Sequence, residues 1–137
     1  MSPDPDQRAD TRAIVVLAGV IRRGDRFLVT RRLADTHLSG MWEFPGGKCE
    51  DRETHEDCLA RELFEELNVR AEIGGEILVT EHAYPDRVVR LHFRWCRFEE
   101  EPLPMLGQEM RWITREELRT LPFPDADRAL IDLLTAV

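Results

Sequence analysis

Residues 47–69 read GKCEDRETHEDCLARELFEELNV, and this stretch decides the fold. It repeats a leucine every four residues, at Leu59, Leu63 and Leu67. That period predicts a helix with one buried stripe. Thr54 followed by Asp57 three residues later is a variant of the capping box, which places the start of the helix at Thr54. Asn68 suits the other end, because asparagine readily adopts the left-handed conformation that ends many helices.

The same helix carries three glutamates, Glu62, Glu65 and Glu66, at spacings of three and four residues. This spacing gathers the carboxylates on one helical face. Like charges placed so repel by a few tenths of a kcal/mol per pair, so the helix is destabilised unless a cation lies among them. Carboxylate oxygens favour a hard cation, which predicts Mg²⁺ or Mn²⁺.

This stretch resembles the Nudix box, G-x5-E-x7-R-E-U-x-E-E-x-G-U, in which U is a bulky aliphatic residue. The matching residues are Gly47, Glu53, Arg61, Glu62, Leu63, Glu65, Glu66 and Val69, and only the later glycine differs, being Asn68. A Glu/Arg-rich helix can also be a mere solvated face, but agreement in register at so many positions favours the box. The resemblance implies an α/β protein with the Nudix fold, a mixed β-sheet in an α/β/α sandwich.

The resemblance also implies the chemistry of the site, a metal-dependent hydrolysis of phosphoanhydride bonds. Its metal ligands are expected to be Glu65, Glu66 and the Gly46 carbonyl, with Mg²⁺ as cofactor and Mn²⁺ as an alternative. Glu62 is expected either to bind metal or to take the proton of the attacking water. Arg61 with Glu53 is expected to hold the loop and the helix in register.

Apolar alternation and turn residues place the other elements. Strands are predicted over residues 13–21, 26–31, 77–84, 88–98 and 110–113, with a helical turn over 115–119 and a terminal helix over 125–137. Leu130, Leu133 and Leu134 are expected to face inward on that helix. Residues 33–41 should form an exposed loop, and the proline and paired glycines of 45–47 let the backbone approach a ligand.

Size and composition predict one soluble domain over residues 12–137, preceded by a disordered Pro/Asp-rich leader at 1–11. No apolar run reaches the ~18–20 residues of a membrane span, and no signal peptide is recognisable, so we expect a cytoplasmic protein without a membrane partner. The net charge of −8 argues against duplex nucleic acid as a partner. A monomer or weak homodimer is expected. Three cysteines without metal-ligand spacing predict reduced thiols.

Residues 30–48, TRRLADTHLSGMWEFPGGK, are similar to the segment that precedes the box in MutT-type nucleoside triphosphate pyrophosphohydrolases. The resemblance implies a small nucleotide substrate such as 8-oxo-dGTP, cleaved to a nucleoside monophosphate and pyrophosphate. It places Arg32, His37 and Phe44 around the nucleotide and makes Lys48 a phosphate contact. For these residues a plain structural role is an equal alternative: Phe44 as core, Arg32 as a solvated charge and His37 as an exposed loop residue.

Asp127 stands where the resemblance places a residue that reads the base edge, and bacterial MutT proteins have asparagine there. An ionised aspartate only accepts hydrogen bonds, so it favours amino-bearing edges of guanine or cytosine. Cytosine nucleotides such as CTP or 5-methyl-dCTP are therefore alternative substrates. A nucleoside diphosphate sugar such as ADP-ribose is a further alternative. Asp127 could equally be an ordinary helix-start carboxylate. A non-catalytic recognition domain fits less well, because such domains lose the box glutamates.

The segment EPLPMLGQEMRWI departs from the family in one further place. The resemblance implies a glutamate where this chain has Leu106, and Glu109 is the nearest carboxylate. Either Glu109 or water could replace the missing ligand, since Mg²⁺ tolerates several water ligands.

Overall fold

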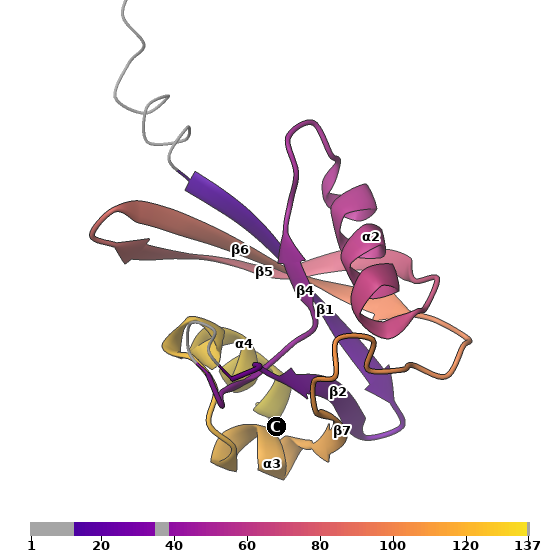
Figure 1. The fold of residues 1–137 in the computed structure, drawn as a ribbon. Coiled ribbons are helices and arrows are strands. Elements are labelled where there is room, and N and C mark those ends of the chain that lie inside the picture. The colour runs from indigo at the N-terminus through magenta and orange to yellow at the C-terminus, as the bar shows by residue number, and fades with distance from the viewer. Residues whose placement is uncertain (1–12, 35–38, 137) are drawn as a thin grey trace, which may run out of the picture.

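The computed structural model describes residues 13–34 and 39–136 (Figure 1). The proposed leader at 1–11 lies outside the described residues. The elements in order are β1 (Ala13–Arg23), β2 (Arg26–Arg31), β3 (Trp42–Glu43), β4 (Gly46–Lys48), α2 (His55–Leu67), β5 (Glu72–Tyr84), β6 (Arg87–Arg97), β7 (Met110–Thr114), α3 (Arg115–Thr120), a 3-10 turn (Asp125–Asp127) and α4 (Arg128–Thr135). No helix within these ranges is long and apolar enough to cross a membrane.

The strands form one mixed sheet with β1 in its middle. The order is β3-β2-β1-β6-β5, with β4 added to β1 and β7 added to β2. Strands β1 and β6 run parallel, whereas the other pairs are antiparallel. The mixed sheet expected from the sequence is therefore confirmed.

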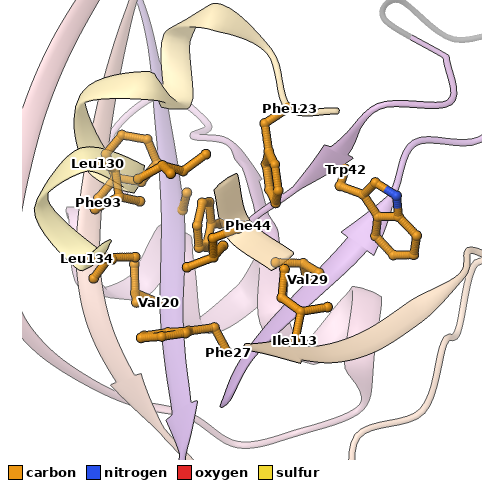
Figure 2. Packing of buried hydrophobic residues seen from close by; sticks show 13 residues of the cluster. Val20, Phe27, Val29, Trp42, Phe44, Phe93, Ile113, Phe123, Leu130 and Leu134 are labelled. Carbon is orange, nitrogen blue, oxygen red and sulfur yellow. The ribbon is translucent and has the colours of Figure 1, made fainter. Parts of the chain in front are cut away.

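Helices cover both faces of this sheet. On one face, the leucine stripe of α2 packs against Leu17 and Leu28, and on the other, side chains of α3 and α4 pack against Val20 and Phe27 (Figure 2). Neighbouring residues of one strand thus enter different cores, which explains why residues 13–21 read as an apolar run rather than as an alternation. The result is the predicted α/β/α sandwich.

Both predicted ends of α2 are present. The Thr54 hydroxyl accepts a hydrogen bond from the Asp57 main-chain N–H at 3.1 Å. Asn68 lies in the left-handed region with φ 57° and donates its N–H to the Phe64 carbonyl. These caps fix where the helix begins and ends.

The structure corrects three expectations about the elements. Leu133 is 51% exposed and does not face inward, because the 3-10 turn delays the start of α4 and the buried stripe runs through Leu130, Ile131 and Leu134. Strand β5 begins at Glu72 rather than at residue 77, since two register shifts between residues 73 and 78 interrupt the alternation. Residues 42–48 add two short strands, β3 and β4.

The expectation of reduced thiols is wrong for two of the three cysteines. Cys49 and Cys58 form a disulfide, with their Cα atoms 5.2 Å apart, and Cys96 is free and buried. Cysteine count and spacing gave no sign of this pair, because its closeness depends on how the loop after β4 folds onto the first turn of α2.

Candidate active site

Strand β4 brings two glycines against the sheet and helix α2. Gly46 pairs with Ala18 of β1, and a Cβ at Gly46 would overlap the Leu17 carbonyl. A Cβ at Gly47 would overlap the carboxylate of Glu62. At Gly46 only glycine fits, because the overlap is with main-chain atoms of β1, whereas a Cβ at Gly47 would displace the Glu62 carboxylate. Strand β4 therefore lies directly beside the acidic face of α2.

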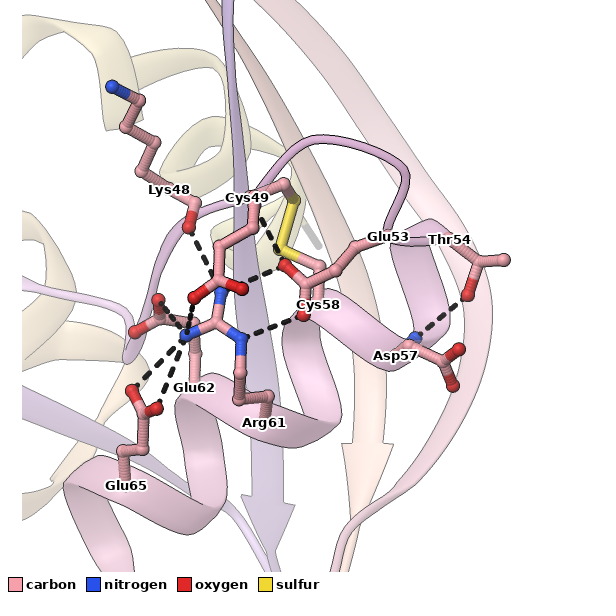
Figure 3. Close-up of a disulfide and its surroundings, with 10 residues drawn as sticks. Lys48, Cys49, Glu53, Thr54, Asp57, Cys58, Arg61, Glu62 and Glu65 are labelled. Carbon is pink, nitrogen blue, oxygen red and sulfur yellow. Dashed lines mark hydrogen bonds and ion pairs between the residues drawn. A yellow bond between two sulfur atoms is a disulfide. The ribbon is translucent and has the colours of Figure 1, made fainter.

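Arg61 joins the loop after β4 to that acidic face (Figure 3). Its guanidinium binds both Glu53 oxygens, at 2.7 and 2.9 Å, and donates to the Lys48 carbonyl at 3.2 Å. The same guanidinium contacts Glu62 at 3.0 Å and Glu65 at 3.2 Å. The bond from Arg61 and a main-chain N–H from Glu50 lower the pKa of Glu53 to about 2. Glu53 is therefore a fixed negative partner for Arg61 at neutral pH.

Glu66 and Glu62 lie deeper than Glu65 and resist ionisation. Burial and the charges of Glu43 and Glu62 raise the pKa of Glu66 to about 8, against a 3.2 Å hydrogen bond from the Gly46 N–H. Burial also raises the pKa of Glu62, opposed by Arg61. Crowded carboxylates of this kind are stabilised by a nearby cation.

The donor set fits a hard divalent cation in its chemistry, since it combines carboxylates with the Gly46 carbonyl. In the part of the chain that the structure describes, however, no three His, Cys, Asp or Glu side chains converge as a preformed metal site. The Arg61 guanidinium lies within hydrogen-bond distance of both Glu62 and Glu65. Glu65, which is half exposed, must turn away from Arg61 if it is to bind metal.

A cavity of about 470 Å³ extends from β4 toward the carboxyl-terminal segment. One set of its lining residues belongs to the box region: Gly46, Gly47, Lys48 and Glu66. A second set comes from the residue after β2, the strand β3 region and the 3-10 turn: Arg32, Glu43, Phe44 and Asp127. The proposed metal end and the proposed base end thus share one cavity.

The structure places both Arg32 and Phe44 at the wall of the cavity. Arg32 forms an ion pair with Glu43 at 2.7 Å and lines the cavity, so it is not a free surface charge. Phe44 is buried, stacks on Phe123 at 5.6 Å and meets Phe93 edge-on at 6.1 Å (Figure 2). Its ring is core and cavity wall at once. His37 lies outside the described residues.

Asp127 is 5% exposed and lines the same cavity. Although it stands at the start of α4, its side chain makes no capping hydrogen bond. Burial and the charge of Glu43 raise the pKa of Asp127 to about 7, opposed by Arg32. The geometry therefore favours a cavity residue over an ordinary helix-start carboxylate.

The segment around Leu106 closes over the end of α2. Gln108 is buried and donates its side-chain amide to the Glu66 carbonyl at 3.1 Å, and the Met105 N–H donates to the same carbonyl at 3.0 Å. Leu106 and Gln108 line the cavity. Glu109 instead pairs with Arg31 at 3.0 Å and is not among the lining residues.

The sequence analysis did not propose several of the lining residues, among them Glu43, Tyr84, Arg87 and Gln108. Tyr84 and Arg87 flank the turn between β5 and β6, and the Arg87 guanidinium lies 5.8 Å from the Tyr84 ring centroid. The sequence did contain one signal for them, because an aromatic and a basic residue on either side of a predicted turn are typical of a ligand-binding surface. No sequence pattern showed that the residues flanking this turn line the same cavity as Arg32.

The chain thus has an α/β architecture in which a glycine strand lies against a glutamate-bearing helix beside a cavity. The family model for the NUDIX domain matches residues 17–133. The chain belongs to this family and is a Nudix hydrolase, an enzyme that acts on phosphoanhydride bonds.

Relatives named for their activities align with most of the chain. The 8-oxo-dGTP diphosphatase of Escherichia coli is 36% identical over 119 residues, which cover 85% of this chain and 92% of that protein. The CTP pyrophosphohydrolase of the same species is 31% identical over 125 residues, covering 90% and 93%. The solution structure of the E. coli ORF135 protein superimposes with a TM-score of 0.82 at 31% identity, covering 91% of this chain and 90% of that one.

Proposed function

We propose that this protein hydrolyses nucleoside triphosphates to a nucleoside monophosphate and pyrophosphate, with 8-oxo-dGTP as the leading substrate. One observation carries the proposal: the box carboxylate Glu66 and the base-end residues Arg32 and Asp127 line a single cavity. A substrate that fills it needs phosphates at one end and a hydrogen-bonding ring at the other. The similarity to the E. coli 8-oxo-dGTP diphosphatase supports this choice.

Nudix hydrolases generally need a divalent metal, and we propose Mg²⁺, with Mn²⁺ as an alternative. Glu65, Glu66, the Gly46 carbonyl and in part Glu62 would hold it. When bound, such an ion neutralises phosphate charge and lowers the pKa of the attacking water. Glu62, which lies on the same helical face, is proposed either to bind the metal or to take that water's proton.

The remaining box residues position these groups. Arg61, held by Glu53, fixes the loop that carries Lys48 against α2. Lys48 lines the cavity and is exposed, so its ammonium can meet a phosphate. Glu109 is a weaker candidate for a metal ligand, because its carboxylate forms an ion pair with Arg31.

A second substrate, CTP or 5-methyl-dCTP, is favoured by Asp127 itself. Its pKa of about 7 lets the carboxyl accept a hydrogen bond when ionised or donate one when protonated, so it suits more than one base edge. The similarity to the CTP pyrophosphohydrolase supports the same alternative. ADP-ribose receives no such specific support.

We further propose that the enzyme works in the cytoplasm on free nucleotides, as a monomer or weak dimer, and does not bind duplex nucleic acid.

The test is a panel of 8-oxo-dGTP, dGTP, CTP, 5-methyl-dCTP and ADP-ribose, assayed with Mg²⁺ for release of monophosphate and pyrophosphate. We expect the highest kcat/KM for 8-oxo-dGTP. Asp127→Ala should remove that preference and leave slow hydrolysis of unmodified triphosphates in place, because the phosphate end is untouched. A higher kcat/KM for CTP would assign the cavity to cytosine, and full activity in EDTA would contradict the metal assignment.

A further inference from the structure

Cys49 and Cys58 lie at the junction between the loop after β4 and the start of α2. Cys49 follows Lys48, and its main-chain N–H is held by the Val15 carbonyl at 3.0 Å. Cys58 is completely buried in the first turn of the helix. The disulfide between them is therefore a covalent bridge between the two segments that form the proposed active site (Figure 3).

Arg61 spans the same junction by non-covalent bonds. It lies three residues after Cys58, and its guanidinium donates to the carbonyl of Lys48, the residue before Cys49. Its other bonds reach Glu53 inside the short loop that the disulfide closes. One junction thus carries two independent clamps, one covalent and one ionic.

The two sulfur atoms differ in access. Cys49 is partly exposed and lines a polar cavity of about 390 Å³ together with residues 13–15, 48–53 and His55. Cys58 is not among those lining residues. A small reagent can therefore reach Cys49 but not Cys58. The third thiol, Cys96, is buried, and burial raises its pKa to about 12, which makes it unreactive.

We propose that Cys49 and Cys58 are a reversible redox site, oxidised by exchange with a low-molecular-weight disulfide such as glutathione disulfide. The Cys49 thiolate attacks one sulfur of that disulfide, forms a mixed disulfide and releases one thiolate. Cys58 is buried, but unlike Cys96 it lies beside a partner sulfur, so it loses its proton and attacks the adjacent Cys49 sulfur within the protein. This second attack forms the protein disulfide and releases the second thiolate. Two electrons pass from the protein to the reagent, and the protons of the two cysteines end on the two released thiols.

Oxidation adds the covalent clamp, and reduction leaves the bonds of Arg61 to hold the junction. A bridge that closes a loop this short should raise Tm by roughly 5–10 °C in a chain of this size. Reversible disulfides of this kind are the usual form in reducing compartments, so the site agrees with the proposed cytoplasmic setting.

The first test counts thiols in the whole protein after equilibration in mixtures of reduced and oxidised glutathione, acid quenching and denaturation. With three cysteines in the chain, we expect three free thiols at the reducing end and one at the oxidising end. Cys96→Ser is the matched control and should keep the same two-thiol transition. Three free thiols at every ratio, or a transition that Cys49→Ser does not abolish, would overturn the proposal.

The second test separates the two clamps. Glu53→Gln weakens the ionic clamp, so its loss in Tm should be at least twofold larger in the reduced protein than in the oxidised protein. Equal losses in both states would show that the disulfide does not duplicate the Arg61 clamp. Neither test uses nucleotide hydrolysis, so their outcome is independent of the proposed function. The thiol count on the unaltered protein decides whether the redox step occurs, even if a cysteine variant fails to fold.

Discussion

Replacing Asp127 by asparagine should stabilise the protein increasingly as the pH rises. Asp127 is buried in the cavity, and burial and Glu43 raise its pKa from 3.8 to about 7. A carboxyl group whose pKa is raised by folding binds protons more tightly in the native state than in the unfolded state. Its presence therefore lowers the free energy of unfolding as the pH rises from about 4 to 7, and the loss is complete above that range.

The size of this effect follows from the two pKa values. The rise from 3.8 to about 7, at about 1.4 kcal/mol for each pH unit, corresponds to about 4 kcal/mol once both states are ionised. About 1 kcal/mol of this destabilisation is already present at pH 4.5. Asparagine has the same shape and no charge to bury, so the difference in unfolding free energy between Asp127→Asn and the unaltered protein should grow by about 3 kcal/mol between pH 4.5 and pH 8.

Urea unfolding of both proteins at several pH values measures that difference directly. The matched control is Asp125→Asn, which removes the same charge two residues away from an exposed position. We expect its difference from the unaltered protein to stay within about 0.5 kcal/mol across the range, as for most surface substitutions. A constant difference for Asp127→Asn as well would refute the reasoning, because it would show that the carboxyl ionises as easily in the fold as in the unfolded chain.

Glu66→Gln should lower kcat by roughly a thousandfold or more and abolish the rise in Tm on adding Mn²⁺, with circular dichroism unchanged, since the amide can still accept the Gly46 hydrogen bond. Glu109→Gln should lower kcat less than threefold because Glu109 pairs with Arg31, whereas a loss of ~10–100-fold would place it at the metal. Leu63→Ala should cost about 2–5 kcal/mol in urea unfolding, because Leu63 is completely buried. Leu133→Ala, at the half-exposed position of α4, should cost under about 1 kcal/mol, and similar losses for both would contradict the burial pattern.

Much of the fold could be predicted from the sequence where local chemistry and periodicity agree. Thr54 and Asn68 mark the ends of α2 because a hydroxyl cap and a left-handed residue act on their own neighbours. The exposure of Leu133 could not be predicted in this way. Its helical phase depends on where α4 begins, and the 3-10 turn before it has no comparable marker.

In the candidate site, too, only those features that depend on local sequence could be predicted. Glu62, Glu65 and Glu66 share one helix, so their spacing alone placed them on one helical face. The position of Asp127 beside Glu43 and Arg32 depends on how the carboxyl-terminal segment packs on the sheet, and only the resemblance pointed to it. The disulfide between Cys49 and Cys58 could not be predicted, because cysteine spacing does not determine how a loop folds back on its helix.

The distribution of charge resolves an apparent conflict between an acidic chain and a polyanionic substrate. The chain has a net charge of −8, yet the cavity is lined by four basic side chains, Arg31, Arg32, Lys48 and Arg87, and by three acidic ones, Glu43, Glu66 and Asp127. Burial further favours the neutral forms of these three acids. We therefore expect the cavity to attract the proposed triphosphate and the net negative charge of the chain to disfavour duplex nucleic acid. Total charge alone could not separate these two effects, because the separation arises only when residues from β2, β4 and β6 meet around one cavity.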